Sequence, residues 1–213
     1  MSYNNGPKIV TNGLIMHLDA ASKRSYPGSG TTWYDLCGNY NGTLVSSPTF
    51  TSDFCGVVNV TSAGARVTVS GINLSTGTYT VIGAARYNVG GTHGRIISST
   101  GNNWLLGHWS AYTDNHYAEG WVQYVVTDTS SNWFIYAGTG DTSADNWKFY
   151  INGVKKADNN GGSAGPNGIQ INGIQGAQEL TDGQCAFVMA YNRVLNDQEI
   201  LQNYEAMKGR FKI

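Results

Sequence analysis

The chain has 213 residues, of which only 13% are charged, and its formal net charge is −1. Because it has no basic block that could follow a phosphate backbone, we expect no nucleic-acid partner. The sequence has no apolar run near the roughly 18 residues of a membrane helix and no export signal at its start, so we expect cytoplasmic synthesis without membrane insertion.

Short runs of β-branched and aromatic residues, separated by turns rich in Gly and Asn, predict about a dozen strands. After a polar N-terminal arm (residues 1–10), the first strand is expected at 14–18. Asn41-Gly42 fits a tight hairpin turn, and Asn152-Gly153 fits another between strands at 147–151 and 154–157. The other predicted strands are 57–60, 66–69, 79–87, 95–98, 104–106, 121–126, 132–138, 169–174 and 185–191. This spacing predicts an all-β, two-sheet sandwich that forms a single domain over residues 11–213.

One short helix is predicted after the last strand. Asn196 can cap it, and Glu199 three residues later can bond back to the amide of the cap, which is a capping box. Gly209 is expected to end it in a left-handed turn. The apolar residues at helical spacing are expected to share its buried face: Ile200, Leu201, Tyr204 and Met207.

Four stretches resemble the concanavalin A-like, laminin G-like jelly-roll family: GLIMHLDA (13–20), TTWYDLCGNYNGTL (31–44), WKFYINGVKKA (147–157) and GQCAFVMAYNRVLNDQEI (183–200). The WYDLCGNYNGTL form and the closing KGRF are similar to versions found in bacteriophage virion proteins. The resemblance implies a jelly-roll sandwich with one short C-terminal helix. For function it implies a non-catalytic virion surface protein, either a capsid decoration or a tail or fibre component.

Such a protein would have other virion proteins as partners and would lie on the virion, assembled in the host cytoplasm. The alternative is a glycan-binding adhesin that recognises host surface carbohydrate. A glycan-active hydrolase is the third hypothesis. It would need two carboxylates about 5–10 Å apart, which on a strand requires acids at i and i+2 or i+4. The sequence has four glutamates, and all are isolated: Glu119, Glu179, Glu199 and Glu205. We therefore expect that the protein is not an enzyme and has no catalytic residue.

Metal ligands are sparse in the sequence. The four histidines lack the spacing of a zinc site. Relatives often hold calcium in an acidic loop, where this chain instead reads VNVTSAGARV (58–67). Calcium is therefore a candidate only through Asp19, Asp35 and Asp182, and the alternative is that these aspartates cap turns. No other cofactor is expected.

The segment from Trp104 to Trp121, WLLGHWSAYTDNHYAEGW, combines aromatic rings with amides and carboxylates. Aromatic rings that stack on sugar C–H faces, next to polar groups that bond hydroxyls, are typical of carbohydrate sites. The candidate ligand-binding residues are His108, Trp109, Tyr112, Asp114, His116 and Tyr117. The alternative is that these aromatics pack under their own loop or against a second copy in a homo-oligomer.

The three cysteines, Cys37, Cys55 and Cys185, are odd in number and include no C-x-x-C pair. We expect reduced and mostly buried thiols. A Cys37–Cys55 bridge, formed by oxidation after lysis, is the alternative.

Overall fold

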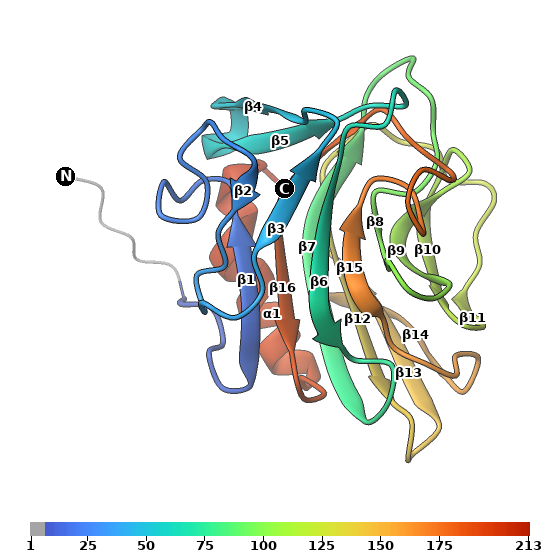
Figure 1. The fold of residues 1–213 in the computed structure, drawn as a ribbon. Helices are drawn as coiled ribbons and strands as arrows, with labels where there is room; N and C mark the ends of the chain where they lie inside the picture. Colours follow the sequence, from blue (N-terminus) through green and yellow to red (C-terminus); the bar gives the residue numbers. More distant parts are fainter. Residues whose placement is uncertain (1–6) are drawn as a thin grey trace.

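A computed structural model describes residues 7–213 of the chain (Figure 1). Within these residues, sixteen strands form two antiparallel eight-stranded sheets, and one α-helix lies near the C-terminus. The all-β sandwich predicted from the strand pattern is confirmed. No helix among the described residues combines the length and the hydropathy of a membrane span.

The first sheet has the order β14-β13-β12-β7-β16-β5-β4. Its strands are β14 (Val154–Asn159), β13 (Asn146–Ile151), β12 (Phe134–Asp141), β7 (Thr78–Tyr87), β16 (Gly183–Tyr191), β5 (Val57–Val60) and β4 (Thr49–Thr51). The eighth strand, β1 (Leu14–Asp19), lies on the same side of β16 as β5 and pairs with a later part of it. β16 pairs with β5 over 183–185 and with β1 over 187–191.

The second sheet has the order β11-β10-β9-β8-β15-β6-β3-β2. Its strands are β11 (Trp121–Gln123), β10 (Tyr112–Ala118), β9 (Trp104–Trp109), β8 (Ile97–Ser98), β15 (Asn167–Ile171), β6 (Arg66–Asn73), β3 (Gly42–Val45) and β2 (Thr32–Trp33). β11 and β2 therefore lie at opposite edges of this sheet.

The main core lies between the two sheets and is rich in aromatic rings. The largest side chains in it are almost completely buried: Trp33, Trp104, Trp147, Tyr79, Tyr136 and Phe149. Burying one such side chain stabilises the fold by about 1.5–3 kcal/mol. All nine residues of β16 are buried, because its inner face contacts this core and its outer face is also covered. The continuous apolar run at 185–191 follows from this burial on two sides.

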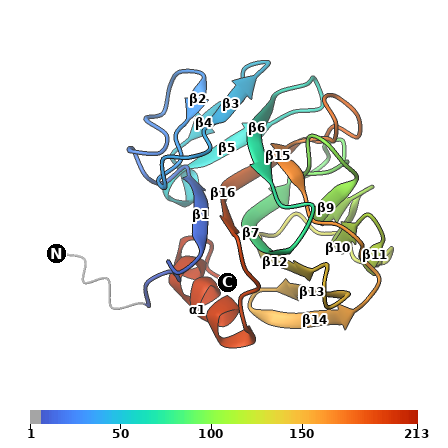
Figure 2. The same cartoon turned by 60° about the horizontal axis from the view of Figure 1, so that its bottom comes forward.

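The helix α1 (Asp197–Met207) lies against the outer face of the first sheet (Figure 2), and a second core lies between them. The predicted capping box is present. Asn196 Oδ1 accepts from the Glu199 amide at 2.9 Å, and Glu199 Oε2 accepts from the Asn196 amide at 3.0 Å. Ile200 and Met207 are buried, as predicted.

Two details of the helix prediction are wrong. Leu201 is 46% exposed, because Asn203 takes the inward position and bonds the amide of Val10 and the hydroxyl of Tyr191. Gly209 does not end the helix in a left-handed turn. Instead the chain continues into the 3-10 turn Lys208–Arg210.

Residues 1–6 of the predicted arm lie outside the described residues. Its last residues rest on α1. The Lys8 carbonyl accepts from Gln202 Nε2 at 2.7 Å, and the Val10 amide donates to Asn203 Oδ1 at 2.8 Å. Val10 is itself buried in the second core, so this end of the segment packs with the domain.

Two strand-level predictions also differ from the structure. Asn41-Gly42 is not a tight hairpin, because residues 34–41 connect β2 to β3 and Gly42 is already the first residue of β3. The carboxylate of Asp35 organises that connection by accepting three of its backbone N–H groups and one from β1. The second difference is β10 (Tyr112–Ala118), where no strand was predicted and the aromatic residues were expected in a loop. It pairs with β9 through a two-residue turn, Ser110-Ala111, whose φ angles are positive.

Candidate functional site

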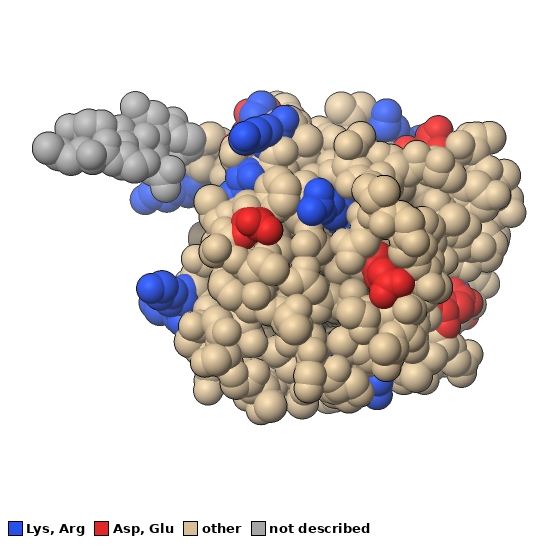
Figure 3. Space-filling view, turned by 90° about the horizontal axis from the view of Figure 1, so that it is seen from above, with Lys and Arg blue, Asp and Glu red and all other residues tan. Residues whose placement is uncertain are grey.

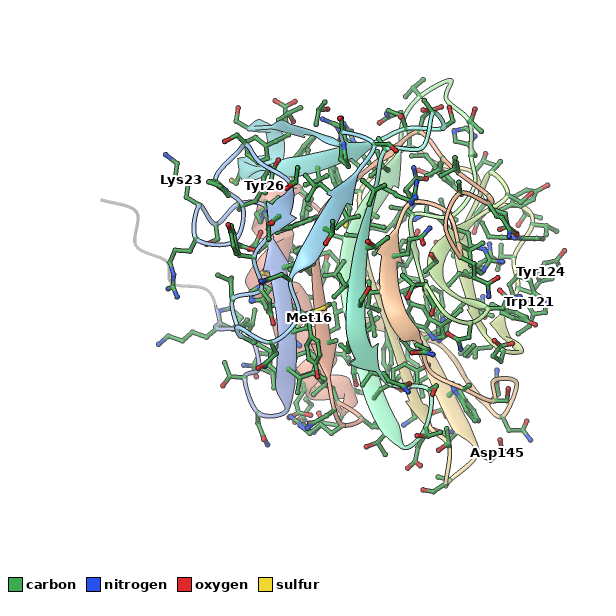
Figure 4. The ribbon with its side chains drawn as sticks, in the orientation of Figure 1. Met16, Lys23, Tyr26, Trp121, Tyr124 and Asp145 are labelled. Atoms are coloured by element: carbon green, nitrogen blue, oxygen red, sulfur yellow. The ribbon has the colours of Figure 1, made fainter. Side chains whose placement is uncertain are left out.

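Four aromatic side chains gather on the outer face of β9, β10 and β11, and we call them the aromatic patch: Trp109, Tyr117, Trp121 and Tyr124. Trp121 lies at its centre. Its ring centroid is 5.3 Å from that of Trp109, 4.9 Å from Tyr117 and 4.6 Å from Tyr124. Trp121 is 36% exposed and Tyr124 is 55% exposed. Figure 4 shows both side chains at the rim of the molecule, pointing away from the sandwich.

Strand alternation places this patch on the outside. Successive strand side chains point to opposite faces, so Tyr117 points outward between the core residues His116 and Ala118. Gly107 marks an irregularity in β9. It has a φ of +90°, and a Cβ at this position would lie 2.3 Å from the ring of Tyr136. Only glycine fits this close approach, after which Trp109 points outward.

The segment that carries Tyr124 is fixed by a buried amide. Asn115 Oδ1 accepts from the Val125 amide at 2.8 Å, and its Nδ2 donates to the Val125 carbonyl at 2.9 Å. This pair of bonds imitates a strand ladder and continues the sheet beyond β11. No local pattern in the sequence indicates this role of Asn115, because its partner lies ten residues away.

A pocket of about 380 Å³ adjoins the patch through Trp109. Polar and apolar groups line it together: Thr92, His93, Trp109, Ser110, Glu179 and Leu180. Arg95 holds the Glu179 carboxylate with an Nε–Oε2 distance of 2.6 Å. A second pocket of about 300 Å³ also includes His93, together with Tyr87 and Ala111. The tip of the β9–β10 hairpin thus stands between two pockets beside the aromatic rings.

The six residues proposed from sequence do not form one site. Trp109 and Tyr117 belong to the patch. Tyr112, half-buried, lies opposite Trp109 across the hairpin. Asp114 is also half-buried, and burial, together with the neighbouring Asp128, raises the pKa of its carboxyl.

His108 and His116 are completely buried, so neither can contact an external ligand. The ring of His108 lies between Tyr87 and Tyr136, with centroid distances of 4.5 and 5.3 Å. Burial lowers the pKa of His108 to about 3 and that of His116 to about 4. His116 Nδ1 also bonds the Leu105 carbonyl at 2.8 Å. Both imidazoles are therefore neutral core residues.

The three aspartates considered for calcium each accept hydrogen bonds from protein donors. Asp19 accepts from the Ala21 amide at 2.9 Å and from Arg210 Nη1 at 2.8 Å, and Asp35 accepts four backbone N–H groups. Asp182 accepts two backbone N–H groups from neighbouring loops. They act as turn caps, the alternative reading from sequence. No group of three or more His, Cys, Asp or Glu in residues 7–213 has a geometry that could hold a metal ion.

The three thiols are free, so Cys37 and Cys55 are not bridged in this structure. Only Cys185 is buried, whereas Cys37 is half-buried and Cys55 is exposed, contrary to the expectation of mostly buried thiols.

No protein-family model matches this chain, and no curated protein is detectably similar in sequence. Similar folds occur among solved structures. The receptor-binding domain of a botulinum neurotoxin C/D mosaic serotype aligns with a TM-score of 0.65 and 16% identity, over 92% of this chain and 52% of that one. The binding domain of Paraclostridial Mosquitocidal Protein 1 aligns with a TM-score of 0.64 and 13% identity, over 91% and 52%.

The sialidase of Trypanosoma rangeli, solved with a covalently bound 2,3-difluorosialic acid, also aligns. Its TM-score is 0.64 at 13% identity, over 98% of this chain and 35% of the sialidase. The fold is a concanavalin A-like sandwich. The chain spans about a third of the sialidase and about half of the two binding domains. At these identities the likeness establishes the fold and leaves function to the site itself.

Proposed function

We propose that this domain is a non-catalytic glycan-binding module whose ligand lies on the aromatic patch and enters the adjacent pocket. One observation carries the proposal: Trp121 and Tyr124 are exposed next to each other and continue through Trp109 into a pocket with polar walls. Soluble domains seldom leave contiguous aromatic surface in water unless it contacts something.

The arrangement has the two components that sugar recognition needs. The rings of Trp121 and Tyr124 can stack on the C–H faces of a pyranose. His93, Ser110 and Glu179 line the pocket beside them and can bond hydroxyl groups. Tilts of 57–74° between Trp121 and its neighbours give an uneven surface that favours some sugar orientations over others.

The same pocket argues for binding rather than cleavage. A glycosidase places two carboxyl groups across the scissile bond. Among the described residues that line the two pockets, only Glu179 has a carboxylate, and that carboxylate already forms an ion pair with Arg95. The similar folds named as binding domains of toxins are consistent with a recognition role.

A glycan array tests the proposal. The parent protein should bind a defined set of glycans, and Trp121→Ala should lose most of that signal. Tyr34→Ala is the matched control, because Tyr34 is also an exposed aromatic (48%) but follows β2 at the opposite edge of the sheet. A parent protein that binds no glycan, or a Trp121→Ala variant that binds as the parent does, would contradict the proposal.

The location on a bacteriophage particle is a separate proposal that rests on the sequence resemblance alone. Under it, the glycan-binding face would be displayed by a capsid, tail or fibre protein toward the host surface. The test is mass spectrometry of purified particles from cells that express the gene. If the protein is absent from purified particles, the virion location is rejected, and the glycan proposal is unaffected.

A further inference from the structure

A pocket of about 380 Å³ lies on the outer side of the first sheet, away from the aromatic patch. The end of β7, the start of β12 and the segment after α1 meet there. Six of its lining residues carry the argument: Phe54, Arg86, Trp133, Asn152, Phe211 and Lys212. Its volume is within the range of small-molecule sites.

The guanidinium of Arg86 is held rigidly in this pocket. Its Cζ lies 4.9 Å from the ring centroid of Phe54 and 5.3 Å from that of Trp133. Its Nε donates to Gln184 Oε1 at 2.8 Å. Two aromatic contacts and one hydrogen bond fix the plane of the fork before any ligand arrives.

Arg86 differs from the other well-anchored arginines in its lack of a carboxylate. Arg95, Arg193 and Arg210 each form an ion pair at 2.6–2.8 Å. Among the described residues, neither Nη atom of Arg86 has a hydrogen-bond acceptor, and no acid lies within ion-pairing distance of it. Burial lowers the pKa of the Arg86 guanidinium, and the more distant Asp53 only partly offsets this. A half-buried charge without a partner is a preformed anion site.

Two further groups that line the pocket can also donate hydrogen bonds, Asn152 and Lys212. Asn152 Oδ1 accepts from the Ile135 amide at 3.0 Å, which fixes the amide and leaves its Nδ2 available. Lys212, an exposed residue of the lining, adds a second positive charge. An acceptor-rich, negatively charged ligand complements such a set of donors.

We propose that this pocket binds the carboxylate of a small hydroxylated ligand, the chemical class to which acidic sugars belong. The carboxylate accepts two parallel hydrogen bonds from the Arg86 Nη atoms. The ligand hydroxyls accept from Asn152 Nδ2, and the positive charge of Lys212 adds electrostatic attraction. This site does not depend on the glycan proposal, because it shares no residue with the aromatic patch or with the pocket next to Trp109.

The test uses D-glucuronate as the probe and methyl glucoside as its neutral match. Binding is followed through the indole N–H resonances of ¹⁵N-labelled protein, with Trp133 assigned through Trp133→Phe. Glucuronate should move the Trp133 resonance in a saturable way, and methyl glucoside should not. Arg86→Gln should weaken glucuronate binding at least tenfold, whereas Arg24→Gln, a change at an exposed arginine, should leave it unchanged.

Arg86→Lys is the control for misfolding, because it keeps the positive charge and removes only the planar guanidinium. This variant should fold and should bind glucuronate several-fold more weakly than the parent protein. Equal movement of Trp133 by both sugars, or equal glucuronate affinity in Arg86→Gln, would overturn the proposal. Tighter binding of inorganic phosphate than of glucuronate at this site would overturn the carboxylate assignment. A shift of Trp121 in place of Trp133 would assign glucuronate to the aromatic patch and would also reject the pocket.

Discussion

The outer faces of the two sheets are both apolar in part, but only one is covered. On the first sheet, Ile82, Ile135 and Met189 lie beneath α1 and the segment that ends at Val10. On the second sheet, Trp121 and Tyr124 of the aromatic patch stay in contact with water. The covered face contributes to folding through burial, whereas the open face keeps its apolar area available for a ligand.

Charged residues are few in the chain, and the face shown in Figure 3 carries only scattered ones on a largely uncharged surface. Apolar contact and hydrogen bonding, rather than long-range attraction, therefore dominate what such a surface can recognise.

The largest expected effect is a loss of folding stability at acidic pH. Its source is two histidines on the inward side of the strands that carry the patch. His108 and His116 have folded pKa values of about 3 and 4, below the unfolded value of about 6.5. Between these values the unfolded chain binds protons that the folded chain excludes. Stability is therefore complete above about pH 6.5 and falls as the pH falls.

By pH 5 the loss should be about 2 kcal/mol for each imidazole, or about 4 kcal/mol together. Urea unfolding at pH 7 and pH 5 measures it. His108→Phe should remove about half of the difference, because His108 is one of the two imidazoles. Phenylalanine can replace it, because the ring nitrogens of His108 have no hydrogen-bond partner among the described residues. An unchanged difference in His108→Phe would reject His108 as a source.

The next effect concerns the covered face. Ile200→Ala should destabilise the protein by about 2–5 kcal/mol, because Ile200 is 2% exposed on the buried face of α1. Leu201→Ala, one position along the same helix, should cost less than about 0.5 kcal/mol, because Leu201 faces water. Chemical denaturation of both variants measures the contrast. Equal losses would mean that α1 is rotated or undocked in solution.

The start of the helix should contribute less. Asn196→Ala removes the side chain that caps the Glu199 amide, and we expect a loss of about 1 kcal/mol. Gln198→Ala is the control, since Gln198 is exposed in the first turn. Thermal melting of the two variants compares them. An Asn196→Ala variant as stable as Gln198→Ala would show that the cap contributes nothing measurable.

The smallest effect on stability is expected on the open face. Tyr124→Ala should cost less than about 1 kcal/mol, since Tyr124 is 55% exposed. Tyr34→Ala should behave similarly. Melting curves of the two variants provide the measurement. A Tyr124→Ala loss as large as that of Ile200→Ala would mean that the patch is a structural core rather than a binding surface.

The sequence predicted the elements whose signals are local. The strand at 185–191 and the Asn196 cap were predictable because each depends on neighbouring residues alone. Leu201 was misplaced, because helical spacing permits both 200 and 201 on one face. The polar Asn203 fills the inward position only through its bonds to Val10 and Tyr191, which are distant in sequence.

The site was predictable only in part for the same reason. Composition drew attention to Trp109 and Tyr117, whose rings lie in the aromatic patch. It also suggested His108 and His116, which strand alternation and the irregularity at Gly107 direct into the core. Tyr124 was missed because its place in the patch depends on Asn115, which pins the segment after β11 through bonds that no local pattern announces.

The central claim, that the open face of β9–β11 binds glycan, is tested most directly through the tryptophan indoles. A glycan selected on the array is titrated into ¹⁵N-labelled protein, and the indole N–H resonances are followed. Trp109 and Trp121 should shift with saturation, whereas the core residues Trp33, Trp104 and Trp147 should not move. Saturable binding with Trp109 and Trp121 unmoved would contradict the account.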